Sequence, residues 1–264
     1  MSSILIATIS MGGLAAFFAV MLSIVHERFK VEEDPRVEEI LSCLPGVNCG
    51  ACGFASCRSL AEAIVKGEAA VNSCVAGGGS VAEKISRIMG VESGSVKKKV
   101  AFVRCGATLS ERSKKATYQG VNTCRAANIL MGADTACLYG CLGFGDCEEA
   151  CLFDAIKMVD GLPRIDLSKC TGCGRCVEVC PRGIIVLDSF ENTNYRVKCS
   201  SLDRGKKARQ VCTKSCIACR RCEKSCPYEA CWVEDNLAHI DPRNCQLCGI
   251  CSMVCPTGAI VKVE

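Results

Sequence analysis

The pattern of hydrophobic and polar residues sets the N-terminus apart from the rest of the chain. Residues 4–25 form a run of 22 positions without a charged side chain. As an α-helix this run would be about 33 Å long, at roughly 1.5 Å per residue, and the hydrocarbon core of a bilayer is about 30 Å thick. A cleavable signal peptide has a basic start and an apolar run of roughly 7–15 residues. The sequence shows neither, so it predicts an uncleaved transmembrane anchor.

Basic residues follow this run, and none precedes it. Arg28 and Lys30 lie just beyond its end, and lysine and arginine concentrate on the cytoplasmic side of membrane helices. We therefore expect a single-pass protein of the cell (plasma) membrane whose soluble part is cytoplasmic. Residues 27–39 are rich in charge and predict a linker to that soluble part.

Short elements are expected beyond the linker. Residues 56–65 have the pattern of a helix, with Gly67 as its stop signal. Residues 157–165 and 232–240 have the pattern of short β-hairpins. Together these elements predict an α+β fold.

Cysteine makes up 26 of the 264 residues, enough to replace much of a conventional core with inorganic clusters. In a secreted chain such a density would indicate a disulfide framework. The spacing of the cysteines and the lack of a cleavable signal favour a reducing compartment instead. Aromatic residues are few and the net charge is only +4, so composition gives no indication of nucleic-acid binding.

Three stretches have the spacing Cys-x2-Cys-x2-Cys-x3-Cys-Pro, at residues 170–181, 216–227 and 245–256. This is the bacterial ferredoxin pattern for [4Fe–4S] clusters, in which three cysteines bind one cluster and the fourth binds its neighbour. Zinc is the alternative, but it favours two separate Cys-x2-Cys pairs rather than triplets closed by Cys-Pro. The pattern therefore favours iron–sulfur clusters.

A further cluster is predicted nearer the N-terminus. Its candidate ligands are Cys49, Cys52, Cys57 and Cys74. Gly50 and Gly53 let the backbone approach a cluster closely, and Cys57 falls in the first turn of the predicted helix. Zinc is a weaker alternative here, because a single Cys-x2-Cys pair is less diagnostic. Cys43 lies outside the spacing and is expected to be a spare thiol.

The remainder is a gapless internal repeat, in which every repeated cysteine is matched at one constant offset along the chain. Nine cysteines have such a partner, namely Cys124, Cys137, Cys141, Cys147, Cys151, Cys170, Cys173, Cys176 and Cys180, paired in this order with Cys199, Cys212, Cys216, Cys222, Cys226, Cys245, Cys248, Cys251 and Cys255. Each copy is expected to be a ferredoxin-like module for two [4Fe–4S] clusters. The predicted organisation is an anchor (1–26), a linker (27–40), a [4Fe–4S] domain (41–96) and two ferredoxin-like modules (97–190, with an N-terminal extension, and 191–264).

The ferredoxin rule assigns three ligand sets in the two copies. These sets are Cys216, Cys219 and Cys222 with Cys255, then Cys245, Cys248 and Cys251 with Cys226, and in the first copy Cys170, Cys173 and Cys176 with Cys151. The fourth site is irregular, because Phe144 stands where the second copy has Cys219. Cys141, Cys147 and Cys180 then need another ligand, for which the candidates are Cys137 and Cys105.

The cysteines left over suggest a sixth cluster between the modules. If Cys105 completes the irregular site, the remaining quartet is Cys124, Cys137, Cys199 and Cys212. If Cys137 completes it, the quartet is Cys105, Cys124, Cys199 and Cys212. The alternative is a group of buried thiols left by duplication. Cys231 matches Ile156 across the repeat and is expected to be a core side chain.

Basic clusters occur at residues 97–99, 114–115 and 206–207. They are either solvated surface or sites that steer an acidic ferredoxin into contact. The sequence has no nucleotide fingerprint, flavin motif or catalytic triad, and its two histidines, His26 and His239, do not indicate a catalytic base.

The segments Leu-Pro-Gly-Val-Asn-Cys-Gly-Ala-Cys-Gly (44–53) and Tyr-Gly-Cys-Leu-Gly-Phe-Gly-Asp-Cys (139–147), after a membrane anchor, resemble the B subunit of the Rnf complex. The resemblance covers nearly the whole chain and is strongest to the long clostridial form. It implies a component of an ion-translocating ferredoxin:NAD+ oxidoreductase that receives electrons from reduced ferredoxin. The A, C, D, E and G subunits would carry the NAD site, the flavins and the ion path, whereas this chain would carry no NAD or flavin site.

Three functions therefore compete. The first is a polyferredoxin that relays single electrons within an Rnf-type translocase. The second is a polyferredoxin of an Rsx-like or other membrane reductase that feeds a different acceptor. The third is a structural zinc protein.

Overall fold

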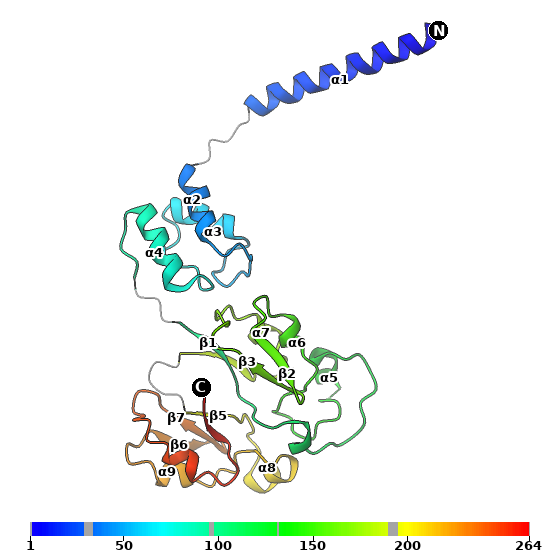
Figure 1. Cartoon of the computed structure of the whole chain (residues 1–264). Helices are drawn as coiled ribbons and strands as arrows, with labels where there is room; N and C mark the ends of the chain where they lie inside the picture. The colour runs from blue at the N-terminus through cyan, green and yellow to red at the C-terminus, as the bar shows by residue number, and fades with distance from the viewer. Residues whose placement is uncertain (1, 29–33, 95–97, 131, 190–194, 264) are drawn as a thin grey trace.

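The computed structural model describes residues 2–28, 34–94, 98–130, 132–189 and 195–263. Lys30, used above for membrane orientation, and Lys97, part of a predicted basic cluster, lie outside these residues. The elements follow the chain as one long helix, three shorter helices, and then short helices alternating with paired strands (Figure 1). The mixture of helices and strands agrees with the expected α+β class.

The long helix is α1 (Ser2–Arg28). Its segment Leu5–Arg28 is long and apolar enough to cross a membrane, and every side chain of residues 5–28 is exposed in the isolated chain. Leu14, Phe17 and Leu22 each expose more than 60% of their surface. Such exposure of large apolar side chains suits a lipid environment and not water.

The helical segment (residues 34–94) contains α2 (Pro35–Cys43), α3 (Cys57–Val65) and α4 (Gly78–Met89). Helix α3 confirms the predicted helix. Its N-cap is Ser56, whose side chain accepts from the amide of Ser59, and such a cap satisfies one of the amides left free at a helix start. The helices pack through fully buried apolar side chains, namely Ile40, Leu60, Ile64 and Ile85.

Both predicted hairpins are present. Strand β2 (Ile156–Val159) pairs with β3 (Leu162–Ile165), and β6 (Cys231–Glu234) pairs with β7 (Leu237–Ile240), each antiparallel. The connecting residues, Asp160-Gly161 and Asp235-Asn236, all have positive φ. Two central residues with positive φ are the signature of a type I′ turn, which matches the twist of a two-residue hairpin.

A second strand pair closes each module and was not anticipated. In the first module (residues 98–189), β1 (Val100–Val103) pairs with β4 (Ile185–Asp188). In the second module (residues 195–263), β5 (Tyr195–Val197) pairs with β8 (Ile260–Lys262). Thus the first strand of each module returns to its last strand. The remaining elements are short helices, namely η1 (Leu109–Glu111), α5 (Cys124–Ile129), α6 (Asp146–Glu149), α7 (Arg175–Val179), α8 (Gly205–Val211), α9 (Arg221–Lys224) and α10 (Ile250–Met253).

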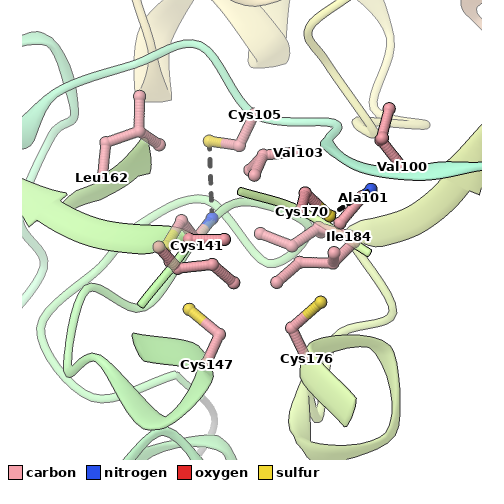
Figure 2. Packing of buried hydrophobic residues seen from close by; sticks show 13 residues of the cluster. Val100, Ala101, Val103, Cys105, Cys141, Cys147, Leu162, Cys170, Cys176 and Ile184 are labelled. Carbon is pink, nitrogen blue, oxygen red and sulfur yellow. Dashed lines mark hydrogen bonds between the residues drawn. The ribbon is translucent and has the colours of Figure 1, made fainter. Parts of the chain in front are cut away.

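Cysteines form much of the interior of the modules. In the first module Cys105, Cys141, Cys147, Cys170 and Cys176 are buried together with Val103, Leu162 and Ile184. Figure 2 shows two of these sulfurs accepting backbone hydrogen bonds: the amide of Cys141 donates to Cys105 Sγ (3.4 Å), and that of Ala101 donates to Cys170 Sγ (3.4 Å). Cys231 is also buried, at 5% exposure, which confirms it as a core side chain.

The two modules pack against each other through main-chain contacts. The amide of Ser113 donates to Val211 O (2.9 Å), and the amide of Thr213 donates to Glu111 O (3.0 Å). Arg196, from β5, forms an ion pair with Asp188 at the end of β4. The two main-chain contacts fix the loop that precedes α5 against the end of α8, and the ion pair joins β5 to the end of β4.

Candidate iron–sulfur centres

The four predicted ligands of the helical segment line one cavity. Asn48 helps to shape it, because its side-chain oxygen accepts from the amide of Cys57 (2.8 Å). The amide of Gly53 donates to Gly50 O (2.9 Å), and both glycines have positive φ, so this tight loop needs residues without a Cβ. Burial raises the pKa of the Cys74 thiol, since a buried thiolate without a counter-charge is disfavoured.

The regular sites of the two modules follow the predicted spacing. Cys216, Cys219, Cys222 and Cys255 line one cavity. Burial, with Cys170, Cys173 and Cys151 as neighbouring thiols, raises the pKa of Cys176 to about 12, which puts these four cysteines close together. In the remaining set, Cys226 and Cys251 belong to one buried cluster, while Cys248 is exposed and Cys245 is half-buried.

The irregular site differs from both sequence alternatives. Its cavity is lined by Cys124, Cys141, Cys147 and Cys180, and by neither Cys105 nor Cys137. Asp146 connects Cys124 to this site, because its carboxylate accepts from the amides of Cys124 (2.7 Å) and Arg125 (3.2 Å) at the start of α5. Helix α5 thus brings a thiol to the site from outside the cysteine run.

Phe144 occupies the position that Cys219 has in the second module. Its ring packs edge-on against Tyr118, with 5.4 Å between ring centroids, and both rings contact the cluster of Ala127, Ala133 and Leu142. The ring therefore supports α5 from within the loop. The first module thus lacks a cysteine at position 144, and helix α5 brings the thiol of Cys124 to the same cavity instead.

A further cavity lies between the modules. Its cysteines are Cys105, Cys137, Cys199 and Cys212, each 6–8% exposed. Both quartets considered from the sequence contained Cys124, which does not line this cavity. Four basic residues do, namely Arg104, Arg112, Lys198 and Lys214. Burial raises the pKa of the Cys212 thiol to about 11 and lowers the pKa of the Lys198 ammonium.

The structure explains why the gapless repeat misled at this point. Cys105 follows β1 by two residues, as Cys199 follows β5. Cys105 Sγ accepts from the amide of Cys141, and Cys199 Sγ accepts from the amide of Cys216 (3.3 Å), the repeat partner of Cys141. Cys105 is therefore the structural counterpart of Cys199, although the constant offset of the repeat pairs Cys199 with Cys124. The inter-module cavity receives one equivalent pair of cysteines from each module.

The donor sets fit a multinuclear cluster better than a single ion. Zinc holds thiolates at about 2.3 Å, so its ligands converge tightly on one point. Among the described residues, no three His, Cys, Asp or Glu side chains are grouped in this way. The cysteines instead line cavities in groups of four, which is the number of thiolates that a [4Fe–4S] cluster binds. Coordination would also keep the buried thiols deprotonated despite their raised pKa values.

Two arginines that sequence reasoning missed, the buried Arg112 and the half-buried Arg182, hold the loop between the irregular site and the inter-module cavity. Arg182 donates through Nη1 to the carbonyls of Cys137 (2.6 Å) and Gly140 (3.0 Å). Arg112 donates to the carbonyls of Cys141 and Gly161. Burial lowers the pKa of Arg182, and the nearby thiols Cys137 and Cys141 oppose that shift. The only sequence signal was that Thr257 replaces Arg182 in the second copy.

Comparisons with known proteins agree with this chemistry. A family model described as an Fe-S cluster matches residues 44–76. Two models described as a 4Fe-4S binding domain match residues 163–186 and 238–261, and residues 216–230. The chain thus contains an iron–sulfur domain followed by tandem 4Fe-4S ferredoxin-type domains, as expected from the cysteine spacing.

Full-length relatives decide the family. The chain is 44% identical to the B subunit of the Na+-translocating ferredoxin:NAD+ oxidoreductase complex of Acetobacterium woodii, over 98% of this chain and 78% of the relative. It is 42% identical to the B subunit of the ion-translocating oxidoreductase complex of Methanosarcina acetivorans, over 98% of this chain and 99% of the relative. The chain belongs to this B-subunit family.

A third member has the same extent. The B subunit of the proton-translocating ferredoxin:NAD+ oxidoreductase complex of Clostridium ljungdahlii is 39% identical over 100% of this chain and 94% of the relative. The resemblance to the B subunit of the Rnf complex, noted from two cysteine segments, is confirmed.

Proposed function

We propose that this chain is the membrane-anchored iron–sulfur subunit of an Rnf-type ion-translocating ferredoxin:NAD+ oxidoreductase. It would receive electrons from reduced ferredoxin and relay them singly to the A, C, D, E and G subunits. Family membership, the 4Fe-4S domains and the helix Leu5–Arg28 support an electron-transfer role at a membrane. Its soluble part would be cytoplasmic, with the domain limits expected from the sequence.

We further propose six [4Fe–4S] clusters. Four ligand sets line the cavities or lie close together as described, with Cys124 completing the irregular site. The fifth set, Cys226, Cys245, Cys248 and Cys251, is assigned by the ferredoxin spacing. The sixth would be held by Cys105, Cys137, Cys199 and Cys212 between the modules. When bound, such clusters supply reversible one-electron reduction, with potentials tuned by burial and by hydrogen bonds to sulfur.

Hydrogen bonds and electrostatic interactions between ligand residues of successive sites support this proposal. The amides of Cys216 and Cys141 donate to the two sulfurs Cys199 and Cys105 of the inter-module cavity, so this cavity is joined to a cluster site in each module. Cys147 of the irregular site is electrostatically close to Cys176 of the next site. Cys173 of that site is close to Cys49 of the helical segment.

The series ends at the helical segment, which precedes the soluble modules in the chain. Arg175 Nε donates to the carbonyl of Cys49 (3.3 Å), so a residue of the first module contacts the cysteine loop of the helical segment. Electrons would thus pass from the second module through the inter-module cavity and the first module toward the membrane anchor. The protein residues provide the spacing, the dry surroundings and the positive charges that favour reduction.

Anaerobic purification from native membranes tests the function. The chain should co-purify with a flavin-bearing, NAD-reactive partner, and reduced ferredoxin should bleach its visible iron–sulfur absorbance. Purification with a different reductase that lacks NAD reactivity would contradict the Rnf assignment. Material that is colourless and filled with zinc would contradict electron transfer altogether.

A further inference from the structure

The two modules carry opposite charges at equivalent positions around their first cluster site. Asp134, Asp146 and Glu149 of the first module correspond to Arg209, Arg221 and Lys224 of the second. In the first module Asp146 is engaged by the amides of α5. In the second module no such helix is needed, because Cys219 supplies the thiol. The acidic residues thus occur in the module where α5 covers the site, and the basic residues occur in the module where Cys219 supplies the thiol instead.

The basic residues of the second module form one surface. Helix α8 lies directly on the cysteine loop, since a Cβ added to Gly205 would clash with the carbonyl oxygen of Ile217. Side chains from both segments are exposed around this contact, namely Arg204, Lys206, Lys207, Arg209, Arg220 and Arg221, and we call this surface the basic face. Two acids accompany it: Asp203 pairs with Lys207 (2.7 Å) and Glu223 with Arg220 (3.8 Å). The face retains an excess of positive charge.

This face also lies over an accessible cluster site. Only two of the 26 cysteines, all of which the structure describes, are exposed: Cys219 and Cys248. Cys219 directly precedes Arg220 and Arg221, and all three line the cavity that also contains Cys222 and Cys255. Beside Cys248 the exposed neighbour is apolar, Leu247 at 53%, and the nearby Arg243 is paired with Asp241 (3.0 Å). The two exposed cysteines therefore have different surroundings.

We propose that the basic face is the docking site of an acidic one-electron carrier protein, and that electrons enter at the site of Cys216, Cys219, Cys222 and Cys255. This inference rests on the proposed function and specifies where its donor binds. The carrier loses one electron and the site gains one, with no bond formed or broken. Complementary charge raises the rate of such encounters by about 10- to 1,000-fold at low salt.

Charge reversal on α8 tests the face without altering the cysteine loop. The variant Lys206→Glu/Arg209→Glu, in the full chain with its clusters, should be reduced by an acidic 2[4Fe–4S] ferredoxin about tenfold more slowly at low ionic strength. The difference should shrink at high salt, where surface charges are screened. The matched control is Lys84→Glu/Arg87→Glu, which has the same spacing and charge change on exposed positions of α4. It should be reduced at the wild-type rate.

The outcomes separate the docking site from the function itself. An unchanged rate in the α8 variant, with wild-type iron content, overturns the docking site and leaves the ferredoxin donor intact. If ferredoxin fails to reduce the wild-type chain while dithionite succeeds, ferredoxin is not the donor, and the proposed docking site is wrong as well. If the α8 variant loses only binding to anionic lipid vesicles, the face is a membrane contact and the proposal is wrong. Should the variant lose iron, Lys206→Gln/Arg209→Gln replaces it, with a smaller decrease expected.

Discussion

The two ferredoxin-type modules share a framework but differ at the positions that govern electron transfer. Both have a hairpin with a type I′ turn and a first strand paired with the last. They differ where Phe144 replaces Cys219, where Arg182 replaces Thr257, and where acids replace the bases of the basic face. The buried residues Leu162 and Ile185 recur as Leu237 and Ile260, whereas several residues around the conserved cysteine positions of the repeat have changed. Duplication supplied the scaffold, and substitution around the cysteines made the modules unequal.

The largest expected effect is the loss of whole clusters in double variants. Cys105→Ser/Cys212→Ser should lose about four irons, because both cysteines serve one cluster, whereas Cys124→Ser/Cys212→Ser should lose about eight, because they serve two. Anaerobic iron and sulfide analysis measures both. Cys43→Ser, at a spare thiol of the helical segment, is the control and should keep all its iron.

The reverse pattern has a definite meaning. If the Cys105 pair loses about eight irons and the Cys124 pair about four, then Cys105 completes the irregular site. That result would restore one of the sequence alternatives and contradict the structural equivalence of Cys105 and Cys199.

The next effect concerns the shared core of the two hairpins. Leu162 and Leu237 are repeat partners, and each is 2% exposed. Truncation to alanine should lower the free energy of unfolding by about 2–5 kcal/mol in either module. The destabilisation would be measured as a faster loss of the visible iron–sulfur absorbance in guanidinium. Equal effects would support a common framework, whereas a neutral Leu237→Ala would show that the second hairpin does not hold its module together.

The two turns should respond differently to exchange of their residues. In the first module, a Cβ added to Gly161 would lie 2.5 Å from Leu109 Cγ, so Gly161→Asn should destabilise by about 1–3 kcal/mol through overpacking. Asn236→Gly loses only the hydrogen bond from its amide to Leu202 O (3.1 Å), which contributes about 0.5–1.5 kcal/mol. Denaturation midpoints of the two variants should differ in this order, and the opposite order would contradict the observed packing.

The smallest effect is on reduction potential. Arg182 is a half-buried cation beside the thiols of both the irregular site and the inter-module cavity. Replacing it with glutamine should lower the reduction potential of the nearby clusters. For a one-electron couple, a tenfold change in the ratio of reduced to oxidised cluster corresponds to about 59 mV. Arg182→Lys retains the charge and should shift less. An EPR-monitored redox titration measures this, and unchanged potentials in Arg182→Gln would show that the arginine only supports the loop.

Sequence patterns predicted the elements that depend on local signals. The capped helix α3 and the hairpins were predicted because Ser56 and the two-residue turns leave characteristic spacings. The strand pairs β1–β4 and β5–β8 were missed, since the two strands of each pair lie at opposite ends of a module and short apolar stretches do not identify a partner. The regular ligand sets follow directly from the ferredoxin spacing.

The irregular and inter-module sites required three-dimensional information. Cys124 lines the same cavity as Cys141, and Asp146 holds the start of α5 beside it; no spacing rule records such a contact. The constant offset of the repeat paired Cys124 with Cys199, whereas the backbone pairs Cys105 with Cys199. Arg112 and Arg182 carried no sequence signal of burial, because arginine is ordinarily exposed.

The iron content of the intact chain tests the account most directly. The central claim is that a cluster held by Cys105, Cys137, Cys199 and Cys212 connects the two modules. Anaerobically prepared full-length protein should contain about 24 irons and as many acid-labile sulfides, corresponding to six clusters. A reproducible content of about 20 irons, with four free buried thiols, would contradict the inter-module cluster and break the proposed path between the modules.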